Sequence, residues 1–599
     1  MLAAAVLFAS PARSAESSLP PGVETLPEAW SAPGGAGFVG DFAMGTGLPF
    51  NFLGLVAGSV AERGGLLPET APWPGIPEIA APTVWFDSTA IVVGEGGAWR
   101  GFGGSLVELR AIAQPPVGRK PRAAFTLVNG SSAVNRTGLL MSRGGDASWM
   151  RGGVLDDERA GAGILSRRGQ HVWFAELGRR LGAHTFSGTF SQRGLAGGTR
   201  LDTRFVEPFF RPPFFGFDEA GRGESGGLTW RWSGSRRSLV TTVSRSHDHR
   251  ESVEPASGLL RGEREGQSNA VTIEATAGGD GREHGLRLEL RQSQVRRRED
   301  QSLLLVVNPP PSRTIERSAW LAARDQRPLG AGTLELAVGG GRSESPALSG
   351  ERWQAAPSLV WRLGPASRQL RLVAERVVTP IWSDLAPGVK PFVQDVWAAG
   401  VDASLGAPAR QWLRLGLLGA DIGNRAALVR FPLRDISLRI GWTPDAERVQ
   451  DAMVTVAAGA RRGAWAIEAS GFSRVRPAGT EPAKVDPAIG ARAAAETGFR
   501  AFAGDLGVRL RVEAAWVGER ESESFPGYFS PPQPLEGYAT YGGSAALTLG
   551  DATIVVRAQN LEDVAHPQTW TDPSSPFPGT PAPGSARQFR VELSWPFFN

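Results

Sequence analysis

Residues 94–104, GEGGAWRGFGG, have the composition of a cofactor-binding loop, with six glycines and one arginine in eleven positions. A dinucleotide-binding loop has the spacing G-x-G-x-x-G and opens a helix. Counted from Gly94 and Gly96, the third glycine would fall at Trp99, and the lysine that ends a phosphate-binding P-loop is absent. The residues that follow, SLVELRA, alternate like a strand. We therefore predict no nucleotide site here and expect the glycines to supply bare backbone.

Two further patterns resemble catalytic or metal-binding motifs. GESGG (223–227) fits the G-x-S-x-G pattern of serine hydrolases, which requires a strand before the serine and a helix after it. We expect a polar loop before Ser225 and the strand LTWRWS after it, so the pattern does not predict a hydrolase. HDH (247–249) places two imidazoles on one side of an extended segment, as in a metal site, but a solvated loop explains it more simply. We predict no catalytic residues, no metal and no cofactor, and do not expect an enzyme.

An aromatic cluster, EPFFRPPFFGFD, lies in a long polar segment. Exposed aromatic side chains on a loop are unusual unless they pack against the protein or bind something. Two interpretations stay open: the loop folds back onto the protein, or it contacts a ligand directly. The candidate ligand-contacting residues are Phe209, Phe210, Arg211, Phe214, Phe215 and Phe217.

The composition disfavours a nucleic-acid binder. The 599 residues include no cysteine, which excludes disulfides, thiolate zinc sites and cysteine nucleophiles. The 64 basic and 60 acidic residues leave a net charge of only +4, and the basic residues are spread along the chain. The 77 glycines, 45 prolines and 19 tryptophans indicate many turns and many interfacial aromatics.

The first residues have the pattern of an export signal. Residues 1–15, MLAAAVLFASPARSA, have the apolar core and the small residues of a secretory signal peptide. The positively charged start of such a signal is missing, which favours a translational start upstream of Met1. No stretch approaches the ~20 apolar residues of a membrane helix. We therefore expect a periplasmic, extracellular or outer-membrane protein.

From about residue 122 the sequence alternates between apolar and polar residues with the period of a β-strand. AVTIEATA (270–277) is followed by the turn GGDG, and GLRLELRQ then places Leu286, Leu288 and Leu290 opposite charged residues. In a soluble sandwich the apolar face would meet a second sheet. In a membrane barrel it would meet lipid, while the charged face would line a wet lumen. One hairpin fits either fold.

The connections favour the barrel, because short turns alternate with long polar segments, as in outer-membrane barrels. The 484 residues from 116 to 599 allow about 22 residues per strand and connection if the barrel has 22 strands, the number found with plugged lumens. We predict an all-β membrane protein, a large antiparallel transmembrane β-barrel of about 22 strands, to within two to four strands. Short turns are expected near residues 181–184, 234–237, 278–281, 327–331, 364–367, 406–409, 504–506 and 550–551, with one or two between 444 and 463.

Two regions together resemble the TonB-dependent outer-membrane receptors. Near the C-terminus, a hairpin, an Asn-Leu-x-Asp element (Asn560, Leu561, Asp563) and an aromatic closing strand are similar to the end of that family's barrel. STAIVVGEGGAWRGFGGSLVELRA (88–111) is similar to the end of its plug domain, although Glu95 stands where the family usually has an arginine. The residues of the barrel-closing strand are Phe589, Val591, Leu593, Trp595, Phe597 and Phe598.

The resemblance implies a domain organisation: a signal peptide over 1–15, a short plug domain in the lumen over 16–115, and a transmembrane β-barrel over 116–599. It implies a monomer in the bacterial outer membrane. In the plug's glycine loop, side chains would clash with the lumen wall, and Glu95 and Arg100 would pair with lumen-facing charges. The loop residues are Gly94, Glu95, Gly96, Gly97, Arg100, Gly101, Gly103 and Gly104.

The resemblance also implies a function, TonB-dependent active transport of a scarce nutrient such as a ferric siderophore or cobalamin. The TonB–ExbB–ExbD complex would supply energy from the inner-membrane proton gradient, and the closing strand resembles the signal read by the outer-membrane assembly machinery. Two alternatives stay open: a passive porin-like or fatty-acid-type channel independent of TonB, and an adhesin or exported enzyme on a β scaffold. TonB would bind a short extended segment by strand addition, and the candidate is Val23, Glu24, Thr25, Leu26 and Pro27.

Overall fold

The computed structural model describes most of the chain from residue 51 onward, with gaps. Residues 1–50, which include the expected signal peptide and the candidate TonB segment 23–27, lie outside the described residues. The described residues are 51–52, 55–56, 58–63, 65–66, 88–93, 97–103, 106–113, 116, 120–131, 134–160, 166–200, 216–253, 260–279, 281–299, 312–344, 352–365, 367–381, 389–407, 410–424, 426–432, 438–444, 448–475, 488–521, 534–563, 567–571, 581–583 and 587–597.

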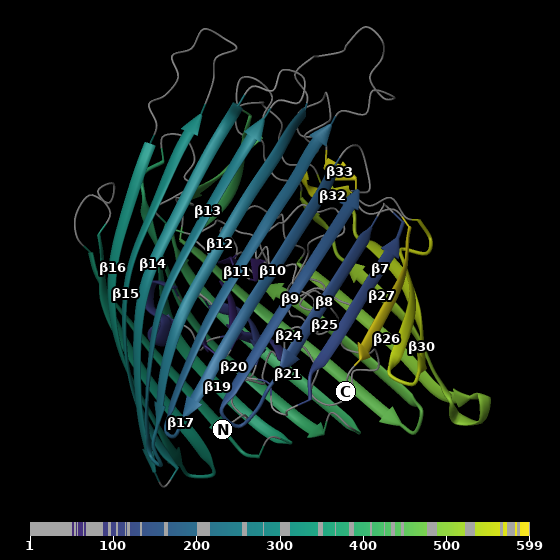
Figure 1. The fold of residues 1–599 in the computed structure, drawn as a ribbon, viewed down its shortest axis with the longest axis horizontal. Coiled ribbons are helices and arrows are strands. Elements are labelled where there is room, and N and C mark those ends of the chain that lie inside the picture. The colour runs from purple at the N-terminus through teal and green to yellow at the C-terminus, as the bar shows by residue number, and fades with distance from the viewer. Residues whose placement is uncertain are drawn as a thin grey trace, which may run out of the picture.

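Twenty-two strands form one closed antiparallel barrel, in which the last strand, β34, pairs with the first, β7. The predicted fold class and the predicted strand number are therefore confirmed. The strands are strongly tilted and enclose a wide lumen (Figure 1). The barrel strands are β7 (Arg122–Gly130), β8 (Asn135–Arg143), β9 (Ser148–Ala160), β10 (Ser166–Leu181), β11 (His184–Arg200), β12 (Gly216–Ser233), β13 (Arg237–Val253), β14 (Leu260–Gly279), β15 (Arg282–Glu299), β16 (Ser312–Leu329), β17 (Gly332–Glu344), β18 (Arg352–Leu363), β19 (Arg368–Ile381), β20 (Phe392–Ala407), β21 (Gln411–Gly423), β24 (Val449–Arg462), β25 (Trp465–Val475), β26 (Ile489–Ala501), β27 (Leu506–Val517), β30 (Tyr538–Leu549), β31 (Ala552–Gln559) and β34 (Gln588–Phe597).

The short turns lie at one end of the barrel, the lower end in Figure 1. Each turn expected from the sequence joins two consecutive barrel strands, and one more joins β8 to β9. In outer-membrane barrels the short turns face the periplasm. Small hairpins interrupt connections at the other end: β22 (Ala426–Pro432) with β23 (Leu438–Pro444), β28 (Arg520–Glu521) with β29 (Pro534–Leu535), and β32 (Pro567–Thr571) with β33 (Pro581–Pro583).

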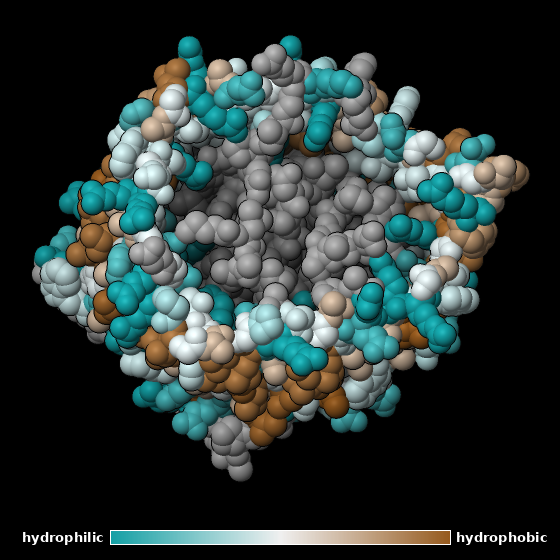
Figure 2. Space-filling model, turned by 90° about the horizontal axis from the view of Figure 1, so that it is seen from below, coloured by the Kyte–Doolittle hydropathy of each residue, from teal (hydrophilic) through white to brown (hydrophobic). Residues whose placement is uncertain are grey.

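The two faces of each strand meet different surroundings. In β34 the outward side chains Phe589, Val591 and Trp595 are about half exposed, whereas Arg590 and Glu592 between them are buried on the lumen side. Seen from the short-turn end, apolar side chains gather around the outside of the barrel and hydrophilic ones lie along its rim (Figure 2). The alternation read from the sequence therefore separates a lipid face from a polar lumen face.

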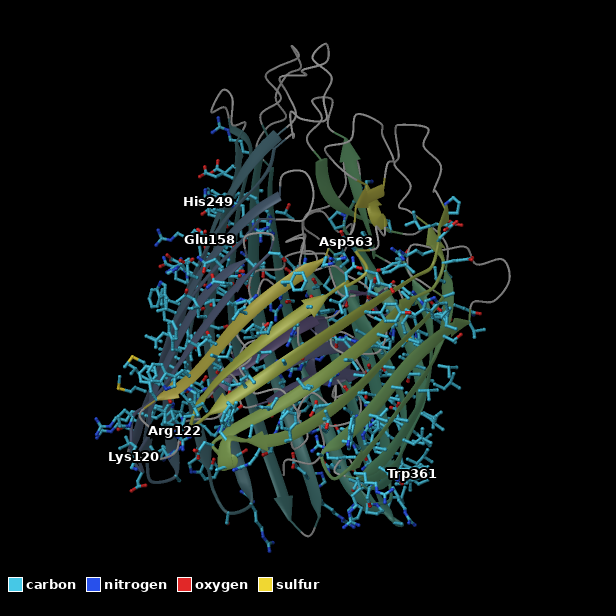
Figure 3. All side chains as sticks on the ribbon, turned by 90° about the vertical axis from the view of Figure 1, so that its right-hand side faces the viewer. Lys120, Arg122, Glu158, His249, Trp361 and Asp563 are labelled. Carbon is cyan, nitrogen blue, oxygen red and sulfur yellow. The ribbon has the colours of Figure 1, made fainter. Side chains whose placement is uncertain are left out.

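Several strands are longer than the sequence suggested. Two polar segments expected to be loops are partly strand, because β11 continues to Arg200 and β13 to Val253. The expectation failed because strand backbone continues above the lipid, where both faces of the sheet are wet and the apolar alternation ends. Figure 3 labels Glu158 and His249 toward this end, and Lys120, Arg122 and Trp361 near the short turns.

The Asn-Leu-x-Asp element turns the chain after β31 toward the closing strand. Asn560 and Asp563 both have positive φ angles, of 50° and 56°, a conformation that Asn and Asp tolerate better than most residues. The Asp563 amide donates to the Asn560 carbonyl at 2.9 Å. The Asp563 carboxylate then accepts from the backbone N–H of Arg587, 2.7 Å away and one residue before β34.

Before the barrel, the chain forms small elements. β1 (Asn51–Phe52) pairs with β2 (Leu55–Val56). A four-stranded mixed sheet has the order β4-β3-β6-β5, with β3 (Gly58–Arg63), β4 (Gly65–Leu66), β5 (Ser88–Val93) and β6 (Val107–Ala113). Between β5 and β6 lie a one-turn helix, α2 (Gly97–Arg100), and a 3-10 turn, η4 (Gly101–Gly103). Figures 1 and 3 both show these purple elements within the barrel outline.

Within the described ranges, no helix has the length and hydropathy needed to cross a bilayer.

If the outer face of the closing strand meets lipid, an arginine introduced there should lower the stability of the barrel. Val591, in the middle of β34, is 51% exposed on the outer face, so we expect Val591→Arg to destabilise the barrel by about 2–4 kcal/mol. Leu549→Arg is the control, because Leu549 is also exposed outward but adjoins the turn at Gly550. Leu549→Arg should lower the free energy of unfolding by only about 0–1 kcal/mol. Urea unfolding in lipid vesicles measures both, and equal costs would contradict a lipid-facing band.

Candidate functional site

The glycine-rich segment lies against the inner wall of the barrel. Gly97 and Arg100 are in α2, and Gly101 and Gly103 are in η4. The predicted site residues Gly94, Glu95, Gly96 and Gly104 lie outside the described residues. We call the wall region that α2 and η4 contact, on strands β15 to β19, the α2 seat.

Side chains of the seat satisfy backbone groups of α2 that a one-turn helix leaves unpaired. The Gly97 N–H donates to Glu375 Oε2 on β19 at 3.3 Å. The Ala98 carbonyl accepts from Trp320 Nε1 on β16 at 3.0 Å, and the Trp99 carbonyl accepts from Arg287 Nη1 on β15 at 3.1 Å. A short helix cannot satisfy its terminal N–H and C=O groups internally. Three barrel strands thus hold α2 by its backbone.

Aromatic packing supports the same contact. Phe102 meets the Trp320 ring edge-on, with ring centroids 4.9 Å apart. The Arg324 guanidinium lies over the Trp99 ring, 4.7 Å from its centroid, in a cation–π contact. Trp99 and Phe102 pack against a buried cluster of wall residues, Trp320, Ala322 and Ala356. The seat is therefore an apolar patch on an otherwise charged lumen face.

Glycines make this close approach possible. A Cβ on Gly97 would lie 2.6 Å from the Arg376 carbonyl oxygen and 2.7 Å from Val377 Cγ2. Gly101 has φ +62°, and a Cβ there would overlap the Trp320 ring. On the wall, a Cβ on Gly339 of β17 would overlap the Ala98 carbonyl oxygen. Both surfaces are kept bare where they meet.

The seat's wall residues were not identified from the sequence. One available signal was the run Gly339–Gly340–Gly341 inside a predicted strand, since interior strand glycines often mark a close approach of another backbone. Trp320 gave no usable signal, because its spacing in β16 is that of an ordinary inward residue. Its partner carbonyl lies 222 positions away along the chain.

Buried charges surround the seat. Glu289 on β15 lies between two arginines of its own strand, with Arg287 Nη2 at 2.7 Å and Arg291 Nη2 at 2.8 Å. Arg100 of α2 also acts on Glu289 electrostatically. Burying a charge is costly unless it is paired, so these contacts let the lumen wall remain charged around α2.

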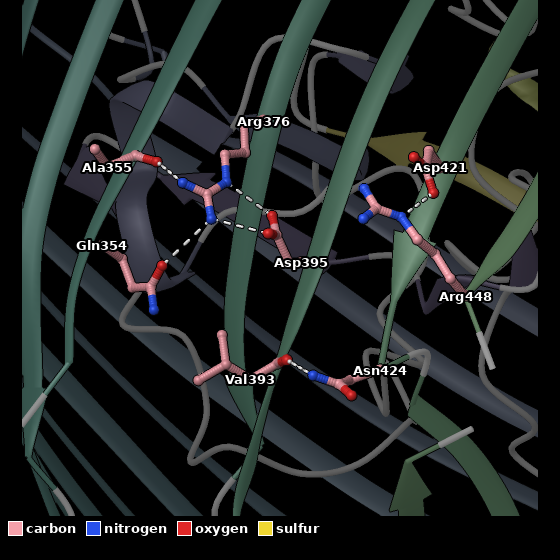
Figure 4. Close-up of polar contacts among 8 residues, drawn as sticks. All are labelled: Gln354, Ala355, Arg376, Val393, Asp395, Asp421, Asn424 and Arg448. Atoms are coloured by element: carbon pink, nitrogen blue, oxygen red, sulfur yellow. Dashed lines mark hydrogen bonds and ion pairs between the residues drawn. The ribbon is translucent and has the colours of Figure 1, made fainter. Parts of the chain in front are cut away.

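Next to the seat, the strands β18 and β19 lie side by side without ladder hydrogen bonds over part of their length. The β18–β19 ladder runs only from the Ser358–Glu375 pair to the Leu363–Leu370 pair, although both strands continue upward. Arg376 of β19 connects the two strands there, because its Nη1 donates to the Ala355 carbonyl of β18 at 2.9 Å (Figure 4). Its Nε and Nη2 bind both oxygens of Asp395 on β20, each at 2.8 Å. Arg376 thereby satisfies a carbonyl that the ladder leaves open.

Other sequence predictions have different outcomes. Of the aromatic cluster, only Phe217 lies in a described element, β12, opposite Thr199 of β11. Ser225 also lies inside β12, so a strand and not a loop precedes it, and strand continues after it. The loop prediction for HDH is wrong as well. His247 and His249 are part of β13, and the described residues contain no group of three or more His, Cys, Asp or Glu that could hold a metal.

The seat geometry predicts that Gly101→Ala displaces α2 and η4 from the wall. Overpacking costs about 1–3 kcal/mol, so trypsin should cleave after Arg100 roughly tenfold faster in the folded barrel. Gly182→Ala is the matched control, because Gly182 has φ +59° but nothing lies within 4 Å of an added Cβ. Mass spectrometry of limited digests measures the cleavage. Equal protection of Arg100 in both variants would show that the Trp320 contact does not hold the segment.

Comparison with solved structures shows the same architecture in transporters and receptors. The FrpB iron transporter from Neisseria meningitidis aligns with a TM-score of 0.70 at 10% identity, over 91% of this chain and 93% of that one. The copper transporter OprC aligns with a TM-score of 0.72 at 12% identity, over 91% of this chain and 92% of that one. The ferric yersiniabactin uptake receptor FyuA from Yersinia pestis aligns with a TM-score of 0.68 at 12% identity, over 92% of this chain and 91% of that one.

No protein-family model and no curated protein matches the sequence, so the likeness rests on the fold. Together with the lipid-facing outer surface, the fold places the chain in the bacterial outer membrane. The chain is a 22-strand outer-membrane β-barrel with the fold of the TonB-dependent receptors.

Proposed function

We propose that this chain imports a scarce nutrient across the outer membrane by TonB-dependent active transport. The observation that carries the proposal is the α2 seat, where three hydrogen bonds and an aromatic contact tie a segment preceding the barrel to the lumen wall. A segment held there must move before a large ligand can pass. Breaking several buried contacts together requires work, which a diffusing ligand does not supply.

The structural neighbours support a substrate class, because they are described as an iron transporter, a copper transporter and a ferric yersiniabactin uptake receptor. A metal chelate or a molecule of similar size is therefore the proposed ligand. It would bind at the end opposite the short turns, and the aromatic cluster around Phe209–Phe215 is the proposed contact. Phe217 begins the strand that leaves this cluster.

The proposed energy source is the inner-membrane proton gradient, transmitted by TonB with ExbB and ExbD. Residues 23–27 would pair with a strand of TonB by strand addition, since VETLP can lie extended. Pulling on this segment would act on the chain that leads to α2. The residues 16–115 would then work as the plug domain, and the α2 seat as the last contact to release.

Two further proposals concern assembly. The aromatic face of β34, which ends in Trp595 and Phe597, is the proposed signal for the outer-membrane assembly machinery. Because β34 pairs with β7, neither end strand of the barrel sheet is free to pair with another copy, which supports a monomer.

A panel of ferric siderophores and cobalamin tests the transport proposal in cells that express the chain. We expect accumulation of one ligand, and we expect deletion of TonB or collapse of the proton gradient to abolish it. Uptake that persists without TonB would instead establish the passive porin-like alternative. Protein levels in the outer membrane, measured in parallel, separate loss of transport from loss of the barrel.

A single substitution tests the proposed TonB segment. Leu26→Pro removes a backbone N–H that strand addition needs, so we expect it to abolish ligand uptake without changing ligand binding to cells. Leu26→Ala keeps the N–H and should retain most of the uptake. If Leu26→Pro transports as well as Leu26→Ala, TonB does not engage residues 23–27.

A further inference from the structure

The outer face of β13 to β16 changes from apolar to polar at one row of side chains across the four strands. Below the boundary, toward the short turns, the outward residues are Val243, Val271, Leu290 and Ala319. We call the next outward residues on the same strands, toward the long connections, the boundary row. They are Arg245, Asn269, Gln292 and Arg317, and all four are exposed.

The register places the boundary row side by side. Arg245 lies opposite Asn269, Asn269 opposite Gln292, and Gln292 opposite Arg317. Strands are about 4.8 Å apart, so the backbones of the two arginines are about 14 Å apart. Their long side chains can turn toward the two amides between them.

A groove of about 830 Å³ follows this boundary on the outer surface. Its apolar part is lined by Leu177, Phe190, Leu228 and Val243, and its polar part by Arg245 and Arg317. A ligand lying in the groove would therefore contact aliphatic and aromatic side chains at one edge and guanidinium groups at the other.

Both boundary arginines lack a charged partner among the described residues, unlike several outward charges on this wall. Neither Arg245 nor Arg317 has a side-chain hydrogen bond or ion pair with any residue that the structure describes. Farther toward the long connections, several outward charges pair with one another. Glu265 contacts His247 Nε2 at 3.2 Å and Arg296 Nη1 at 3.7 Å, and Arg222 contacts Glu224 at 2.7 Å.

We infer that the boundary row binds a phosphorylated glycolipid of the outer leaflet. The acyl chains would lie along the apolar row, and the phosphates would accept hydrogen bonds from Arg245 and Arg317. The Asn269 and Gln292 amides would contact the sugar headgroup. Two guanidinium groups that lack carboxylate partners among the described residues favour an anion, and the apolar row beside them favours one that carries acyl chains. This site does not depend on which ligand the barrel imports.

Binding of diphosphoryl lipid A to the purified barrel in neutral detergent tests the inference. We expect the Arg245→Gln, Arg317→Gln double variant to bind roughly 100-fold more weakly, about tenfold for each guanidinium. Arg222→Gln is the matched control, because Arg222 is an exposed outward arginine of the same wall that already pairs with Glu224. It should bind like the unaltered protein. Heat-modifiable migration of each variant confirms that its barrel is folded.

Two further probes identify what is recognised. Phosphatidylcholine should not displace the lipid A, because its headgroup has no net negative charge. Inorganic phosphate at millimolar concentration should not displace it either, because it has no acyl chain. Unchanged binding by the double variant, an equal loss with Arg222→Gln, or full displacement by either probe would overturn the inference.

Discussion

The backbone of a chain in hydrocarbon must satisfy its own hydrogen bonds, and the rest of this structure depends on that constraint. Closing the sheet by pairing β34 with β7 removes the two edges that a 22-strand sheet would otherwise expose to lipid. Where the ladder between β18 and β19 stops, Arg376 reaches across to the Ala355 carbonyl. The Ala355 carbonyl is therefore still hydrogen-bonded, but its donor is a side chain instead of a backbone N–H.

Closure also determines the character of the lumen. A barrel this wide cannot fill its interior with side chains from the wall alone, so inward residues are charged and paired, as Arg371 is with Asp402 and Arg474 with Asp451. The apolar cluster of Trp320, Ala322 and Ala356 interrupts this polar surface beneath α2. A patch of that kind is stable only when something covers it, and Trp99 and Phe102 do so. The wall and the lumen segment are thus complementary surfaces, bare of side chains where their backbones meet.

The outer face shows a second consequence of membrane geometry. About 9–11 residues are enough for a tilted strand to cross the hydrocarbon, yet β14 has 20 residues and β31 only 8. One side of the barrel therefore rises well beyond the lipid, as the long strands β12 to β16 in Figure 1 show. There the outward residues become polar, and the change occurs at the same row on four strands.

The sequence by itself determined the fold class, a strand number near 22, all but one of the short turns and the two faces of the closing strand. These features are local: a period of two residues, a tight turn, or an aromatic alternation such as Phe589, Val591 and Trp595. It missed the upper parts of β11 and β13, because a strand that is wet on both faces has no alternation to detect. Only the tertiary structure decided that Trp320 meets Ala98 and that Glu375 meets Gly97. Such contacts join residues more than 200 positions apart, and closure of the barrel, not local periodicity, brings those residues together.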